Sequence, residues 1–193
     1  LFGEAAPYFY DWLAHPDEDD YWAQWNIEAR HHTIRVPACN VGGWYDIFLG
    51  GTIRNFVGMR ECGATPEARQ GQKLILGPWF HTLPLNNIAG EVNHGLSTTS
   101  LAMDMDGLHL RWFDYWLKGK KNGILEEPPV RIFVMGENRW RTENEWPLAR
   151  TKYTKYYLHS GGKANSLRGD GLLSPESPRS EPADVYVADP RNP

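Results

Sequence analysis

The sequence lacks several features that would fix its class at once. It contains only 2 cysteines among 193 residues, which is too few for a disulfide framework. Its formal charge is −4, from 20 basic and 24 acidic residues, and it has no basic stripe, so we expect no nucleic-acid partner. No apolar run approaches the length of a membrane span, and the first residues lack the basic region of a signal peptide. We therefore expect no membrane association, and the compartment stays open.

Aromatic and apolar residues, by contrast, are plentiful. Hydrophobic residues make up 41% of the chain, including 9 Trp, 9 Tyr and 7 Phe, which is ample for a buried core. A length of 193 residues suggests one or two domains. Cys39 falls in a predicted buried strand, where an inert packed thiol is expected. The sequence shows no internal repeat.

Residues 1–35 read as a cap-like helical segment, rich in aromatics and interrupted by a proline. Its acidic run, Asp17 to Asp20, fits the first turn of a helix, where carboxylates complement the dipole; a divalent-metal site is the alternative. The adjacent His31 and His32 would point about 100° apart on a helix. They cannot converge on one ion, so we interpret them as a helix C-terminus and expect no metal or other cofactor.

The middle of the chain, residues 36–127, alternates strands and helices. The run "VPACNV" predicts a buried strand that ends at Gly42 and Gly43, and a helical apolar stripe follows as far as Gly63. The run "LIL" at 74–76 predicts a second buried strand, and a second amphipathic helix closes at Gly119. This alternation is typical of an α/β fold with a parallel sheet.

The pattern changes near residue 127. From there to residue 193 the segments are short, rich in β-formers and separated by Gly, Ser, Pro and Asn. Such spacing is typical of a sandwich or jelly roll. We therefore place a domain boundary near 127 and predict that residues 128–193 begin a β domain.

Asp46 and His81 are the candidate catalytic residues. Each follows a predicted buried strand in a glycine-bearing turn, and functional groups of open α/β sheets gather at the carboxyl ends of strands. A histidine base held in its tautomer by an aspartate, awaiting a nucleophile, is the chemistry that this pair suggests. The order Asp before His also fits the α/β-hydrolase triad. Alternatively, each residue alone is a common turn former or core residue.

Four motifs resemble one family in order along the chain: "VPACNVGGWYDIF", "LILGPWFHT", "LHLRWFDYWLKG" and "PPVRIFVMGENRWRTENEWP". They are similar to those of the CocE/NonD hydrolases, the group that contains cocaine esterase, α-amino-acid ester hydrolases and X-prolyl dipeptidyl-peptidases. The resemblance implies that Asp46 and His81 belong to a Ser-Asp-His triad. It also implies the C-terminal part of an α/β-hydrolase domain with a cap segment, followed by the start of a β jelly-roll domain from about Pro129.

The family's serine elbow, G-x-S-x-G, does not occur in this sequence. Ser97, Ser100 and Ser160 do not lie at a strand-to-helix elbow, so we interpret them as loop, helix-start and strand-end residues. The resemblance implies that the serine and the oxyanion-hole donors lie upstream. We therefore expect that these 193 residues are part of a longer enzyme and are inactive alone.

The residues around the pair bear on substrate. The amino-acid ester hydrolases bind a substrate ammonium through carboxylates, some of which directly follow the triad aspartate; here the apolar run 47–49 (Ile-Phe-Leu) stands in that place. This favours acyl esters or amides without a free amine. Four aromatic residues are predicted to line an acyl pocket, although core packing is an equally common role for such side chains. They are Trp44, Tyr45, Trp79 and Phe80.

His94 occupies a position where the family resemblance leads us to expect an aromatic such as Phe, and we assign it to a loop. The expected partner is a small-molecule ester or a short peptide, and a homo-oligomer remains open. The alternatives to an acyl esterase are an X-prolyl dipeptidyl-peptidase, a non-catalytic jelly-roll binding module that recognises carbohydrate or peptide, and a structural piece without activity.

Overall fold

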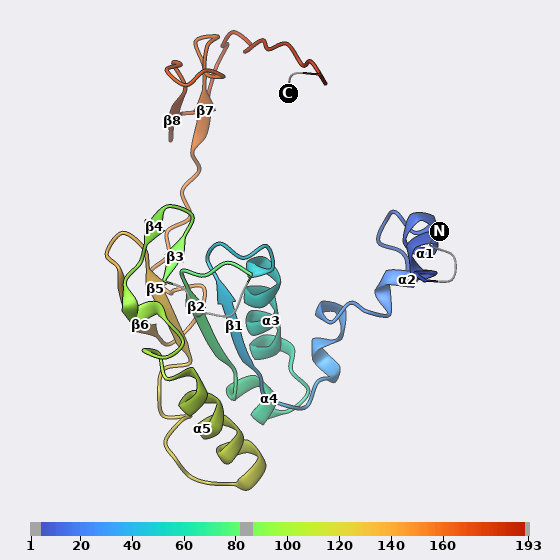
Figure 1. Cartoon of the computed structure of the whole chain (residues 1–193), viewed down its shortest axis with the longest axis vertical. Helices are drawn as coiled ribbons and strands as arrows, with labels where there is room; N and C mark the ends of the chain where they lie inside the picture. The colour runs from blue at the N-terminus through green and yellow to red at the C-terminus, as the bar shows by residue number, and fades with distance from the viewer. Residues whose placement is uncertain (1–4, 82–86, 192–193) are drawn as a thin grey trace. The chain divides into compact units, whose positions relative to one another are not determined.

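The computed structural model describes residues 5–81 and 87–191 (Figure 1). The chain divides into two compact units, Leu1–Ala149 and Arg150–Pro193. The first unit holds all the described helices together with strands β1 to β6. In chain order its elements are α1 (Tyr8–Ala14), α2 (Asp20–Ala23), a 3-10 helix η1 (Glu28–Thr33), β1 (Cys39–Gly43), α3 (Leu49–Cys62), α4 (Pro66–Gln70), β2 (Lys73–Gly77), β3 (Ile88–Ala89), β4 (Val92–Asn93), a 3-10 helix η2 (Leu96–Thr98), α5 (Met105–Lys118), β5 (Val130–Val134) and β6 (Arg139–Glu143).

A four-stranded sheet in the order β1-β2-β5-β6 forms the centre of this unit. β1 and β2 are parallel, with Gly43 opposite Gly77, and β2 and β5 are also parallel. β6 returns antiparallel to β5. The predicted α/β class and the parallel pairing of the two buried strands are therefore confirmed.

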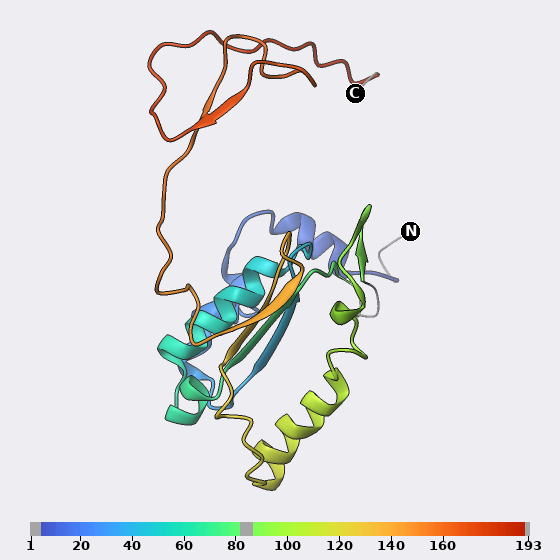
Figure 2. The same cartoon turned by 90° about the vertical axis from the view of Figure 1, so that its left-hand side faces the viewer.

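The two faces of the sheet carry separate apolar clusters, because successive strand residues point to opposite sides. On one face Leu74 and Leu76 pack with Phe56 of α3, and Val130 and Ile132 complete the cluster. On the other face Ile75 packs with Trp79, Met103 and Met105, the last of which begins α5. Figure 2 shows α3 and α5 on opposite sides of the sheet.

The helix ends follow local chemistry. Thr65 caps α4 by accepting a hydrogen bond from Ala68, and Pro66 occupies the first turn, where its missing N–H is not needed. α5 begins later than its apolar pattern suggests, because Asp104 adopts a left-handed conformation (φ 49°) and caps the amide of Gly107. α5 ends at Gly119, which is also left-handed, as the sequence predicts.

The acidic run of the N-terminal segment starts a helix, as predicted. Asp19 is the N-cap of α2 and accepts a hydrogen bond from the amide of Tyr21. His15 lies 2.6 Å from the other oxygen of Asp19, and this hydrogen bond lowers the pKa of the carboxyl group. Within the ranges 5–81 and 87–191, no three His, Cys, Asp or Glu side chains are grouped as metal ligands.

No helix in the described part of the chain combines the length and the apolar composition that a membrane crossing requires.

The region beyond residue 127 is shared between the two units. β5 and β6 belong to the α/β sheet, whereas the contacts divide the chain after Ala149. The second unit contains an antiparallel pair, β7 (Tyr157–His159) and β8 (Leu172–Ser174). The jelly-roll architecture and the boundary near 127 stay predictions.

Candidate active site

Asp46 lies in the turn between β1 and α3. The turn is closed by hydrogen bonds from the amide of Asp46 to the carbonyl of Gly43, at 3.1 Å, and from the amide of Leu49 to the carbonyl of Asp46, also at 3.1 Å. The carboxylate folds back, and its Oδ1 accepts a hydrogen bond of 2.8 Å from the amide of Phe48. Only 14% of the side chain is exposed. One carboxylate oxygen is thus fixed by the backbone, which leaves Oδ2 for another donor.

His81 supplies that donor. Its Nδ1 lies 3.2 Å from Oδ2 of Asp46, and the ring of Phe48 meets the imidazole edge-on, with centroids 4.7 Å apart. When Nδ1 carries the proton and donates it to the carboxylate, Nε2 holds the free lone pair. The His81 side chain is 66% exposed. Nε2 is therefore available to take a proton from a nucleophile.

The turns that carry the two residues are joined by backbone hydrogen bonds. The amide of Trp44 donates to the carbonyl of Gly77 at 2.9 Å, and the amide of Tyr45 donates to the carbonyl of Trp79 at 3.0 Å. The chains approach so closely that a Cβ on Gly43 would collide with the carbonyl of Trp79. The glycine singled out in the sequence is thus required where β1 enters the turn.

The four predicted pocket aromatics divide into two pairs. The indole of Trp44 donates to the carbonyl of Phe133 at 2.7 Å, and that of Trp79 donates to the carbonyl of Thr98 at 2.7 Å. Both rings pack against the core clusters. Tyr45 and Phe80 are 46% and 38% exposed. A role at the substrate stays a prediction for all four, and the exposed pair is better placed for it.

His94 is a feature that the sequence does not explain. It is buried, with 3% of its surface exposed; its Nε2 lies 3.4 Å from the hydroxyl of Tyr45, and its ring meets that of Phe133 edge-on. Its Nδ1 is buried and has no hydrogen-bond partner among the described residues. The one clue in the sequence to this buried position was that the family resemblance leads us to expect an aromatic residue such as Phe there.

The three serines singled out in the sequence have structural contacts of their own. The backbone carbonyl of Ser97, in η2, accepts a hydrogen bond from Trp140 at 2.9 Å, and that of Ser100 accepts one from the amide of Met105 at 3.1 Å. In the C-terminal unit the hydroxyl of Ser160 donates to Asp184 at 2.8 Å. In residues 5–81 and 87–191, none of these serines is hydrogen-bonded to His81.

Two family models match parts of the chain. Residues 3–83 match the family model for X-Pro dipeptidyl-peptidase (S15 family). Residues 122–193 match the model for the X-Pro dipeptidyl-peptidase C-terminal non-catalytic domain. Cocaine esterase of a Rhodococcus species (strain MB1 Bresler) is 35% identical over 197 residues, which cover 100% of this chain and 32% of the esterase. The chain is thus similar over its whole length to part of cocaine esterase, as its resemblance to the CocE/NonD hydrolases implies.

A second relative and a solved structure also match the chain. A Mycobacterium bovis protein named as a serine esterase is 36% identical over 148 residues, 76% of this chain and 20% of the relative. The crystal structure of an aminopeptidase from a marine sediment Thaumarchaeota archaeon superposes with a TM-score of 0.74 at 24% identity, over 98% of this chain and 30% of that one. This likeness concerns the fold. The chain spans about a third or less of the length of these relatives.

Proposed function

We propose that the complete protein cleaves acyl esters or amides through a Ser-Asp-His triad in which His81 is the general base and Asp46 its orienting partner. The observation that carries this proposal is the hydrogen bond of 3.2 Å from Nδ1 of His81 to Oδ2 of Asp46, at the carboxyl ends of two parallel strands. The similarity of the chain to cocaine esterase and to a protein named as a serine esterase supports it.

Each group has one task in this mechanism. Asp46, already held by the amide of Phe48, keeps the proton of His81 on Nδ1 and stabilises the imidazolium that forms during the reaction. Nε2 takes the proton of the attacking serine and then gives it to the leaving group. Because residues 1–193 contain no G-x-S-x-G elbow, we propose that the serine and the oxyanion donors come from outside them.

The surroundings of the pair favour an acyl group without charge. Ile47 is 83% exposed and Phe48 is 56% exposed, and the Phe48 ring touches His81. The surface that directly follows Asp46 is therefore apolar and offers no carboxylate to a substrate ammonium. Tyr45 and Phe80 extend the aromatic surface at the same two turns.

A second candidate activity is that of an X-prolyl dipeptidyl-peptidase, which both family models name. Such an enzyme acts at the free N-terminus of a peptide and therefore has to bind an α-ammonium group. The apolar run after Asp46 makes this the weaker candidate. Release of p-nitroaniline from alanyl-prolyl-p-nitroanilide, compared with cleavage of p-nitrophenyl phenylacetate, separates the two activities.

For the domains we propose a cap over residues 1–35, the hydrolase part over 36–127 and the first part of a jelly roll over 128–193. The match of the C-terminal non-catalytic model from residue 122 onward supports this division. A non-catalytic role of that segment in binding carbohydrate or peptide would be an additional property of the same protein.

The decisive experiment is the Asp46→Asn substitution in the complete protein. Turnover of p-nitrophenyl phenylacetate should fall about 10⁴-fold, because an asparagine no longer holds the catalytic tautomer of His81. Asp106→Asn is the matched control, since Asp106 is an exposed residue of α5, and its turnover should not change. Near-normal turnover of a folded Asp46→Asn protein would overturn the proposal.

A further inference from the structure

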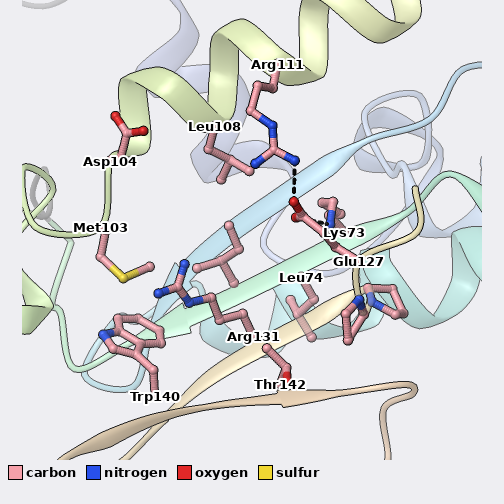
Figure 3. A pocket seen from close by; sticks show the side chains of 13 residues that line it. Lys73, Leu74, Met103, Asp104, Leu108, Arg111, Glu127, Arg131, Trp140 and Thr142 are labelled. Carbon is pink, nitrogen blue, oxygen red and sulfur yellow. Dashed lines mark hydrogen bonds and ion pairs between the residues drawn. The ribbon is translucent and has the colours of Figure 1, made fainter. Parts of the chain in front are cut away.

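A cavity lies beneath α5, on the face of the sheet that α5 covers. Its volume is about 580 Å³, within the range of small-molecule sites. Figure 3 shows the side chains that line it, which come from the start of β2, from β5 and β6, from α5 and from the segment that precedes β5. Asp46 and His81 are not among them.

Two of the three cations in this cavity share one carboxylate. Glu127 accepts a hydrogen bond of 3.3 Å from Lys73 and pairs with Arg111 on its other oxygen. Lys73 is buried. Burial alone would raise the pKa of Glu127, but the hydrogen bond from Arg111 and the charge of Lys73 outweigh it, so that the pKa is lowered. Each carboxylate oxygen of Glu127 is therefore already paired with a cation.

Arg131 is the third cation, and it differs from the other two. Its guanidinium lies 5.1 Å from the centre of the Trp140 ring, and Figure 3 shows it between Trp140 and Met103. Within the described ranges it has no hydrogen-bond partner for its side chain. Burial lowers the pKa of Arg131, partly offset by the charge of Glu127. A guanidinium with all its donors free in a half-buried place is a ready partner for an anion.

The charge of the lining sets the charge of the ligand. Lys73, Arg111 and Arg131 carry three positive charges, and Glu127 and Asp104 carry two negative ones, which leaves one positive charge without a counterpart. The remaining lining is largely apolar. It consists of Leu74, Ile75, Met103, Leu108, Pro128, Pro129 and Trp140, together with the hydroxyl-bearing Thr142.

We propose that this cavity binds a small organic monocarboxylate, with its carboxylate on Arg131 and its apolar body against Met103, Leu108 and Trp140. The planar fork of the guanidinium matches a carboxylate with two parallel hydrogen bonds, and its contact with the indole leaves the outward donors free. One ligand charge balances the site, and the apolar walls select an aliphatic or aromatic acid over inorganic anions.

The site is independent of the proposed hydrolytic centre. It uses the first three positions of β2, Lys73 to Ile75, whereas His81 follows the other end of that strand. The roles of Asp46 and His81 therefore do not affect whether this cavity binds a carboxylate.

Calorimetric titration of the complete protein with phenylacetate, at neutral pH, tests the proposal. Phenylacetamide, which has the same shape without the charge, should bind at least about tenfold more weakly, since a lost charge-assisted pair is worth 1.4 kcal/mol or more. Arg131→Met should weaken phenylacetate binding by a similar factor while keeping the packing against Trp140, and Arg131→Lys should fall between the two. Arg139→Met is the control, because Arg139 is exposed and paired with Glu137; its affinity should not change.

Phenylacetate is also the acid that a phenylacetyl ester would release, so the hydrolytic centre is the competing place for it. His81→Ala separates the two places: binding should persist unchanged in this variant and weaken about tenfold in a folded Arg131→Met protein. Binding that is lost in His81→Ala but kept in Arg131→Met would overturn the proposal. So would the absence of any binding of phenylacetate to the unaltered protein.

Discussion

The amide of Tyr45 donates a hydrogen bond of 3.0 Å to the carbonyl of Trp79, and this bond fixes the turn that carries Asp46 against the turn that carries His81. The approach depends on Gly43, where a Cβ would collide with the same carbonyl. The distance between the two candidate catalytic residues is therefore set by the backbone one to three residues before Asp46 and two residues before His81.

The Gly43→Ala substitution tests this dependence. We expect the complete protein to lose about 1–3 kcal/mol of unfolding free energy, because a backbone carbonyl has to move to accommodate the methyl group. We also expect kcat to fall about a hundredfold, since a displacement of about 1 Å in a catalytic group has this effect. Chemical denaturation and steady-state ester kinetics measure the two effects.

Gly51→Ala is the matched control. Gly51 lies in α3, and a Cβ there would have no atom within 4 Å. This alanine should raise helix stability by about 1 kcal/mol or less and leave kcat unchanged. Equal effects of the two alanines would contradict the role given to Gly43.

Replacing the buried His94 with phenylalanine should stabilise the protein. The substitution removes Nδ1, a buried polar atom without a described partner, and keeps an aromatic ring against Phe133 and Tyr45. A buried unpaired polar group costs about 1–3 kcal/mol, so the thermal midpoint should rise. Differential scanning calorimetry of the complete protein measures it.

The bond that His94→Phe gives up is a long one, 3.4 Å from Nε2 to the Tyr45 hydroxyl, and it should contribute little. Tyr45→Phe isolates that contribution, because it removes the hydroxyl alone. If Tyr45→Phe and His94→Phe both lower the midpoint by several degrees, the pair is a stabilising contact and the prediction is wrong.

The C-terminal unit should respond to pH through His159 and Glu181. Nδ1 of His159 lies 2.6 Å from Oε1 of Glu181, and this hydrogen bond is the main reason why the pKa of His159 is raised above its ordinary 6.5. The same bond lowers the pKa of Glu181 below 4.5. The stabilisation from His159 is complete below pH 6.5 and is lost as pH rises through its raised pKa. That from Glu181 is complete above pH 4.5 and is lost as pH falls through its lowered pKa.

The pair therefore stabilises its unit most at mildly acidic pH, between the lowered pKa and the raised one. Amide hydrogen exchange at Ser160, whose N–H donates to Glu181 at 3.1 Å, reports on this unit. The protection factor of the Ser160 amide, which already corrects for the ordinary rise of the exchange rate with pH, should decline above pH 6.5 in the unaltered protein. His159→Gln should abolish that decline. His109→Gln, an exposed position of α5, serves as the control and should leave the profile intact.

A competition between two esters tests the apolar surface after Asp46. Phenylacetic methyl ester should exceed phenylglycine methyl ester in kcat/KM by about a hundredfold, since a buried ammonium without a partner costs several kcal/mol at 1.4 kcal/mol per decade. A preference for the amine-bearing ester would refute the interpretation of Ile47 and Phe48. Asp→Asn changes from Asp17 to Asp20 would then search for the ammonium partner.

Local patterns predicted the helix stop at Gly119 and the turns that carry Asp46 and His81, because glycines mark such turns within a few residues. They did not predict the ends of β1, which begins at Cys39 rather than Val36 and includes Gly42 and Gly43. The partner of β5 could not be predicted in this way. Val130 and Ile132 have the alternation of any half-buried strand, and only packing against Leu74 and Leu76 places them in the α/β sheet.

The aromatic residues show the same limit. Trp79 stands two residues before His81, yet its indole is directed by a carbonyl at Thr98, 19 positions further along the chain. A sequence gives the size and polarity of a side chain next to a site. It does not give the distant hydrogen-bond acceptor that directs this side chain into the core. The proposed anion-binding role of Arg131 has the same limit. It depends on Lys73 and Arg111 both pairing with Glu127, and the sequence alone does not show those pairings.

Asp46 and His81, 35 positions apart in the sequence, follow the first and last strands of one consecutive stretch of the chain, β1-α3-α4-β2. The backbone hydrogen bonds that join their two turns connect Trp44 to Gly77 and Tyr45 to Trp79, all within residues 44–79. Insertions elsewhere in the chain can therefore accumulate without altering the acid-base pair. A change of substrate range made through segments outside this stretch would therefore leave the acid-base pair in place.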